Sequence, residues 1–228
     1  MVAFGGARVE GMTVTDGPYE KLIELAEDRA YRAAVDLCFS VLDDGEVDRA
    51  FWTLQVGLLH YLNFWENGTL FEEAPRFTEK AVWLDPASAD NHYWHGHIVE
   101  ISFKDTTQAA DQYANALEID PNHVYAHLAV GTSMIAPEEA KAHLEQVLAV
   151  QPRNLRALMV YADVCTRLGL GGAAIAAYEK VIESEPFFER DRGIMNRYIN
   201  TELNFATLRD GVVRDARKRL DGLRRPRL

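Results

Sequence analysis

Apolar residues recur at helical spacing along most of the chain, and four apolar helix ends are each followed by a proline. The four segments are KAVWLDPAS (80–88), NALEIDPNH (115–123), QVLAVQPRN (146–154) and KVIESEPFF (180–188). The prolines follow one another at intervals of 35, 31 and 34 residues: Pro86, Pro121, Pro152 and Pro186. Because proline disrupts a helix interior, each one predicts the end of a helix and a turn into the next.

The segment between Pro152 and Pro186 shows the pattern most clearly, because it contains two apolar stripes separated by glycines. The first stripe consists of Leu158, Tyr161, Ala162 and Cys165, and the second of Ala174, Tyr178, Val181 and Ile182. Both have helical spacing. Three glycines between the stripes predict a turn: Gly169, Gly171 and Gly172.

This unit resembles a tetratricopeptide repeat, a helix–turn–helix of about 34 residues. The family's first helix has a large residue, a large–small pair and another apolar residue. Its second helix has an alanine, an aromatic residue, a small residue and the closing proline. Those places are filled here by Leu158, Tyr161–Ala162, Cys165, Ala174, Tyr178, Val181 and Pro186. Two preceding units fill them less regularly, with His127, Val130–Gly131, Met134, Ala140, Leu144, Val147 and Pro152, and with His92, His95–Gly96, Val99, Ala109, Tyr113, Ala116 and Pro121.

The resemblance covers residues 45–188 well and the flanks weakly. Residues 19–43 predict two more helices, and the earliest clear unit has a long first helix over roughly 49–66. A single unit cannot bury its apolar face, so we expect an all-α protein in which the units stack into a right-handed α-solenoid. We expect a flexible N-terminal arm (1–18), the solenoid (19–188), and capping helices with a basic C-terminal tail (189–228). The two capping helices are predicted over 189–206 and 208–223.

The composition is that of a globular protein, with 228 residues, 48% apolar and 26% charged. The sequence contains no apolar run long enough to span a membrane, and its first twenty residues lack the apolar core of a signal peptide. Cys38 and Cys165 lie far apart, each within a helical pattern, which indicates reduced thiols. These features predict a cytoplasmic protein.

The charge is unevenly distributed along the chain. The net charge is −11, yet the residues from Phe205 onward carry eight Arg or Lys against three Asp, or +5, which leaves −16 for the rest. An acidic body is a poor general binder of nucleic acid. The last helix has an apolar face of Leu208, Val212, Ala216, Leu220 and Leu223, surrounded by arginines. It is either an amphipathic cap or a docking helix for an acidic partner, nucleic acid or an anionic membrane.

The stretch NHYWHGHIVE (91–100) contains three histidines, which raises the question of a metal site. His92 aligns with His127 and Leu158, and His95 with Val130 and Tyr161, so we expect both to be half-buried packing residues with hydrogen bonds. His97 lies two residues after His95 and points the opposite way, so one helix cannot bring all three histidines to one ion. The stretch also lacks the spacing of a zinc-protease helix. The sequence therefore predicts neither a metal nor a cofactor, and no catalytic residue.

The resemblance also implies a concave groove, lined by one stripe from the first helix of each unit. On this register the groove residues are Leu59, Asn63 and Glu66, then Tyr93, His97 and Glu100, then Leu128 and Thr132, then Met159, Asp163 and Thr166. The groove has carboxylates and no lysine, so we expect a peptide or protein partner with apolar side chains and at least one Lys or Arg. The arginine–lysine–asparagine clamp that some family members use for carboxylate tails is absent.

The function expected from these features is a non-enzymatic interaction module or scaffold that binds its partner in the groove. Three alternatives remain open at this point. The protein could be an escort chaperone of a secretion or assembly system. It could be an enzyme that binds a metal or small molecule near His97. The stripe could also be a solvated helix face without a ligand.

Overall fold

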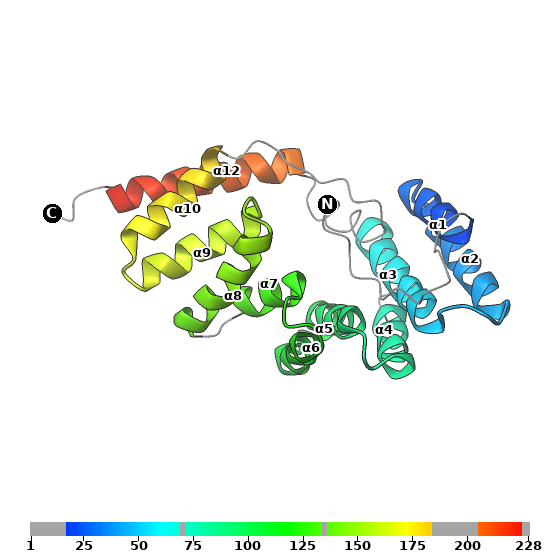
Figure 1. The fold of residues 1–228 in the computed structure, drawn as a ribbon. Helices are drawn as coiled ribbons and strands as arrows, with labels where there is room; N and C mark the ends of the chain where they lie inside the picture. Colours follow the sequence, from blue (N-terminus) through cyan, green and yellow to red (C-terminus); the bar gives the residue numbers. More distant parts are fainter. Residues whose placement is uncertain (1–16, 69–71, 134–135, 184–204, 225–228) are drawn as a thin grey trace.

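A computed structural model describes residues 17–68, 72–133, 136–183 and 205–224 of the protein. The described residues form α-helices and no strand, with these bounds: α1 (Pro18–Glu27), α2 (Tyr31–Asp43), α3 (Arg49–Asn67), α4 (Glu73–Leu84), α5 (Ala89–Phe103), α6 (Thr106–Ile119), α7 (Val124–Thr132), α8 (Pro137–Val150), α9 (Leu155–Arg167), α10 (Gly171–Glu183) and α12 (Phe205–Arg224). The helices follow one another along an open arc from α1 and α2 to α10 and α12 (Figure 1).

The helices pack as consecutive hairpins. The closest pairs are α3 with α4, α5 with α6, α7 with α8, and α9 with α10. Each hairpin then packs on the next, through α4 with α5, α6 with α7 and α8 with α9. Contacts therefore run between neighbours in sequence, as expected for a solenoid. The expectation of an all-α solenoid is confirmed, and so are the two helices predicted within 19–43.

The first helix of each clear unit begins at a residue whose side chain caps the free backbone N–H groups. Asp48, Ser88 and Asn154 accept hydrogen bonds from the N–H three residues later, at Phe51, Asn91 and Ala157. His123 does the same for α7, because its Nδ1 accepts from the N–H of Ala126 at 3.1 Å. These caps fix where each helix starts, which for α5, α7 and α9 is after the turn that follows Pro86, Pro121 and Pro152.

The core between the two helices of a unit depends on small residues that let the backbones approach. A Cβ at Gly96 would lie 2.9 Å from Cβ of Gln112 and 3.1 Å from the carbonyl oxygen of Ala109. The aromatic position of the second helix is buried at both Tyr113 and Tyr178. The small and aromatic positions assigned by the repeat register therefore have the packing roles expected of them.

Helix α12 covers the C-terminal end of the solenoid. Ala216 and Leu220 are buried against the α9–α10 hairpin, and Val212 and Leu223 pack beside them. These contacts agree with the capping interpretation of residues 208–223, although the side chain of Leu208 is not described. The arm over residues 1–16, the part of the other capping helix before 205, Met134, Pro186 and the tail from 225 onward lie outside the described residues.

Both cysteines, Cys38 and Cys165, are buried and free. Within the described ranges, no helix is both long enough and apolar enough to span a membrane.

Candidate functional site

The regular spacing of the units places His92 and His127 at equivalent positions, and both make the same hydrogen bond. Nε2 of His92 lies 3.0 Å from the carbonyl oxygen of Pro86, and Nε2 of His127 lies 2.9 Å from that of Pro121. Because a carbonyl only accepts, the ring N–H is the donor in both units. His92 is 7% exposed, and its Nδ1 lies 2.7 Å from the side-chain amide of Gln112. Because Nε2 carries the ring proton, Nδ1 accepts, and the amide N–H of Gln112 is the donor.

His95 is also a packing residue. It is 5% exposed, and its Nδ1 lies 3.1 Å from Oγ1 of Thr78 in the preceding unit. Burial lowers the pKa of His95, against the opposing effect of nearby Glu79. The expected packing role and hydrogen bonds of His92 and His95 are confirmed, and both rings are buried more deeply than the half-burial expected.

His97 lies on the other side of α5, among aromatic rings. Its ring stacks on Tyr93 at a centroid distance of 5.9 Å and meets Tyr61 and Trp94 edge-on at 6.0 and 5.6 Å. Burial lowers the pKa of His97 to about 3, and the positive charge of Arg156 contributes to the same effect. A general acid or base should titrate near the working pH, so this neutral ring is poorly suited to proton transfer.

Tyr93 differs from the expectation of an open groove residue. It is 7% exposed, because rings from three helices and a turn surround it. Its ring lies 4.7 Å from Trp94, 5.3 Å from His123, 5.7 Å from Tyr125 and 6.0 Å from Tyr113. The groove stripe is therefore also part of the packing between α5 and α7. Leu59, which was also predicted to line the groove, is instead fully buried in the core.

The two described groove carboxylates are engaged within the chain. The hydroxyl of Tyr113 donates to Glu100 at 2.6 Å. The hydroxyl of Tyr178 donates to Asp163, and Arg219 of α12 forms an ion pair with the same carboxylate. Burial and the adjacent Asp163 together raise the pKa of Tyr178 to about 12. Sequence reasoning missed these contacts, although the family's aromatic position in the second helix is where both tyrosines stand.

The other predicted groove residues come from successive first helices. Asn63 is half-buried in α3, as are Leu128 and Thr132 in α7 and Met159 in α9, whereas Thr166 is exposed. Glu66 lies in α3, but its side chain is not described. The structure thus places the predicted residues on α3, α5, α7 and α9 in order along the arc (Figure 1). Partner binding by these residues stays a prediction.

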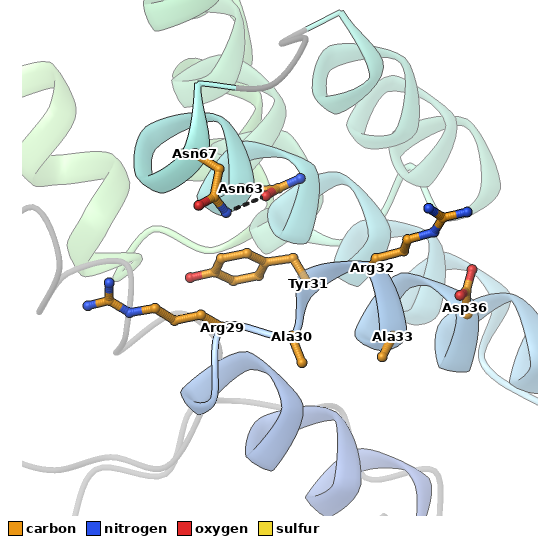
Figure 2. Close-up of a pocket in the computed structure, with 8 residues that line it drawn as sticks. All are labelled: Arg29, Ala30, Tyr31, Arg32, Ala33, Asp36, Asn63 and Asn67. Atoms are coloured by element: carbon orange, nitrogen blue, oxygen red, sulfur yellow. Dashed lines mark hydrogen bonds between the residues drawn. The ribbon is translucent and has the colours of Figure 1, made fainter.

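A shallow, open surface pocket of about 530 Å³ lies where the turn between α1 and α2 meets the C-terminal end of α3. Figure 2 shows Arg29 and Arg32 on opposite sides of the Tyr31 ring, below an Asn67–Asn63 hydrogen bond of 2.7 Å. The remaining lining residues are Ala30, Ala33 and Asp36. No sequence pattern indicates this pocket, because it depends on how α2 packs against α3.

The described part of the chain contains no group of three or more His, Cys, Asp or Glu side chains arranged to hold a metal ion.

Comparisons with known proteins agree with the geometry. Residues 155–188 match the tetratricopeptide repeat family. No curated protein matches the sequence significantly. Among solved structures, MamA is 19% identical over 69% of this chain and 90% of its own, with a TM-score of 0.55. A thermophilic tetratricopeptide repeat protein of Thermus thermophilus, TTC0263, is 19% identical over 82% and 97%, also with a TM-score of 0.55. PilW, a type IV pilus biogenesis factor, is 16% identical over 90% and 91%, with a TM-score of 0.59.

Residues 155–188 therefore match a tetratricopeptide repeat, and the described helices share the solenoid fold of solved tetratricopeptide repeat proteins. Its 155–188 unit carries the family's sequence pattern, and the whole arc has the family's solenoid fold. At these identities the solved structures establish the fold alone. Proteins of this class generally act as non-enzymatic modules for protein–protein interaction.

Proposed function

We propose that the protein is a scaffold that binds a peptide or protein partner on the concave stripe formed by α3, α5, α7 and α9. The observation that carries this proposal is the continuity of the stripe. Half-buried apolar side chains, Leu128 and Met159, follow a cluster of rings around His97, and each group comes from the next repeat. A regular surface of this kind suits an extended segment that contacts several repeats.

The charge pattern refines the chemistry of the partner. Asp163 already has a cation, Arg219, and Glu100 already accepts from Tyr113. A basic residue of the partner would have to compete with these contacts. We therefore propose a mainly apolar partner segment, in which a Lys or Arg contributes only where it displaces Arg219 from Asp163.

The neutral His97 favours this scaffold over an enzyme of the His97 region. A ring stacked on Tyr93 and close to Arg156 offers a flat, uncharged contact surface. We also propose that the protein works in a reducing compartment such as the cytoplasm, and the buried free thiols support this placement.

The proposed function is tested by affinity capture from lysate, followed by mass spectrometry, with matched surface variants. Leu128→Lys combined with Met159→Lys puts charge on the concave stripe. The control is Trp83→Lys, which changes a 77% exposed residue on α4, the second helix of its unit. We expect the double variant to lose partners that wild type and Trp83→Lys retain. If the double variant retains the partners and Trp83→Lys loses them, the partner binds the outer surface of the arc.

A further inference from the structure

The pair His127 and His143 joins α7 to α8 through two imidazole rings. Their Nδ1 atoms lie 2.7 Å apart, and the ring centroids are 5.0 Å apart. Both rings are half-buried, so solvent reaches the pair. Two imidazole nitrogens this close are either bridged by a proton or able to share a metal ion.

The surroundings of His127 fix which nitrogen faces His143. Nε2–H donates to the carbonyl oxygen of Pro121 at 2.9 Å, so in the neutral ring Nδ1 carries the lone pair. A backbone carbonyl that holds the other N–H in this way is the usual support of a metal-ligating histidine. The ring is thus oriented before any ion arrives.

Comparison between repeats shows that the fold does not require two histidines here. His143 stands nine residues before Pro152, and Gln112 stands nine residues before Pro121. Gln112 makes the equivalent contact with His92 at 2.7 Å. The matching places in the last unit hold Leu158 and Ala177, which pack in one apolar cluster. A glutamine or an apolar pair therefore suffices for packing, and one unit alone pairs two imidazoles among the described repeats.

We propose that His127 and His143 form a binding site for a divalent transition metal ion of the kind that prefers imidazole, such as Zn²⁺. Both Nδ1 atoms would be ligands, with water completing the coordination, because the described residues offer no third protein ligand. Binding would clamp the nine-residue helix α7, which carries Leu128 and Thr132, onto α8.

The proton balance of this step is simple. In the neutral pair, His143 donates its Nδ1–H to Nδ1 of His127. Metal binding moves that proton to Nε2 of His143, so a neutral pair releases no proton. Zn–N bonds of about 2.0–2.1 Å require the nitrogens to separate to roughly 3.3 Å, a small rotation of His143.

The test uses full-length protein without a histidine tag, titrated with ZnCl₂ at about pH 7.5 by calorimetry and thermal melting. The matched variant is His143→Gln, which reproduces the His92–Gln112 pair and so preserves the hydrogen bond. We expect wild type to bind one Zn²⁺ and melt at a higher temperature with it. In His143→Gln we expect an unchanged melting temperature without zinc and at least tenfold weaker binding.

The converse variant Gln112→His should create a second pair and raise the stoichiometry to two. A direct readout on wild type avoids any folding defect: zinc should shift the Nδ1 resonances of His127 and His143 in ¹H–¹⁵N spectra and leave that of His92 in place. Wild type that binds no zinc at about 1 mM would overturn the proposal, as would equal affinity in His143→Gln.

Discussion

Asp163 of α9 is bound by Arg219 of α12, so the C-terminal helix reaches the residue that the repeat register assigns to the concave stripe. The hydroxyl of Tyr178 donates to the same carboxylate oxygen from α10. Three helices are thereby joined at one carboxylate. The capping helix therefore does more than cover the last apolar interface, because it also neutralises the last acidic position of the groove.

The first prediction concerns this carboxylate. Asp163→Ala should lower the free energy of unfolding by about 1–3 kcal/mol, because it removes the acceptor of the Tyr178 hydroxyl together with the partner of Arg219. The measurement is urea denaturation followed by circular dichroism.

The control for Asp163 is Arg219→Ala, which keeps the Tyr178–Asp163 hydrogen bond. Its ion pair is partly exposed, so the loss should be at most about 1 kcal/mol. Equal stability of Asp163→Ala and wild type would show that α12 is held by its apolar face alone.

The second prediction concerns the ring of Tyr93. Tyr93→Ala should cost about 3–5 kcal/mol, because it opens a cavity among Trp94, His97 and Tyr125. Any loss of partner binding in this variant would then reflect unfolding. The measurement is thermal melting of Tyr93→Ala and of a control, Thr166→Ala. The control changes an exposed residue, and its expected effect on stability is within about 0.5 kcal/mol. A near-native melting temperature for Tyr93→Ala would show that the Tyr93 side chain is not needed for packing and is an open groove residue.

The third prediction is that acid weakens the fold through His97. Its folded-state pKa of about 3 lies below the unfolded value of about 6.5. Between these values the unfolded state binds the proton and the folded state does not, so stability is lost as pH falls below about 6.5. The slope contributed by one such histidine is at most about 1.4 kcal/mol per pH unit.

The test for His97 compares wild type with His97→Phe in urea denaturation at about pH 5, 6 and 7. Phenylalanine keeps a flat ring against Tyr93 and cannot be protonated. We expect a shallower fall in stability toward acid pH for the variant, with a remaining slope from His95, whose pKa burial also lowers. If the free energy of unfolding fell with pH equally steeply in the two proteins, His97 would not be the source of the acid sensitivity.

The fold could be read from the sequence because the signals that fix it are local. The prolines, the turn at Gly169 and the small–aromatic positions such as Ala174 and Tyr178 each act within one unit of about 34 residues. Gly169 has a φ of 73°, which explains the glycine at that turn. Neighbouring units then stack in chain order, so a correct prediction of each unit also predicts the whole solenoid.

The groove was harder to predict because it depends on contacts between units. The register placed Tyr93 and Asp163 on the correct helices but could not show that rings of α6 and α7 cover Tyr93. Nor could it show that Arg219, 56 residues later, reaches Asp163. Side chains from other helices decide whether a stripe residue is exposed or already contacted within the chain. The helical period of the sequence does not determine where those side chains point.

The last prediction uses glycines to test the close approach of helices within a unit. Alanine is favoured over glycine inside an exposed helix by roughly 0.5–1 kcal/mol. At Gly57, however, a Cβ would lie 2.8 Å from Cγ2 of Thr78 and 3.2 Å from the carbonyl oxygen of Ala74. At Gly96 it would meet Cβ of Gln112 at 2.9 Å. Overpacking of this kind typically costs about 1–3 kcal/mol, which exceeds the helical gain.

We therefore expect Gly57→Ala and Gly96→Ala each to lower the melting temperature, whereas Gly211→Ala in α12 should raise it. A Cβ at Gly211 meets nothing within 4 Å, so only the helical preference acts there. The three variants remove the same flexibility in the unfolded chain, and differences among them therefore report on the folded state. If all three gained stability alike, α3 and α5 would not approach α4 and α6 as closely as the structure shows.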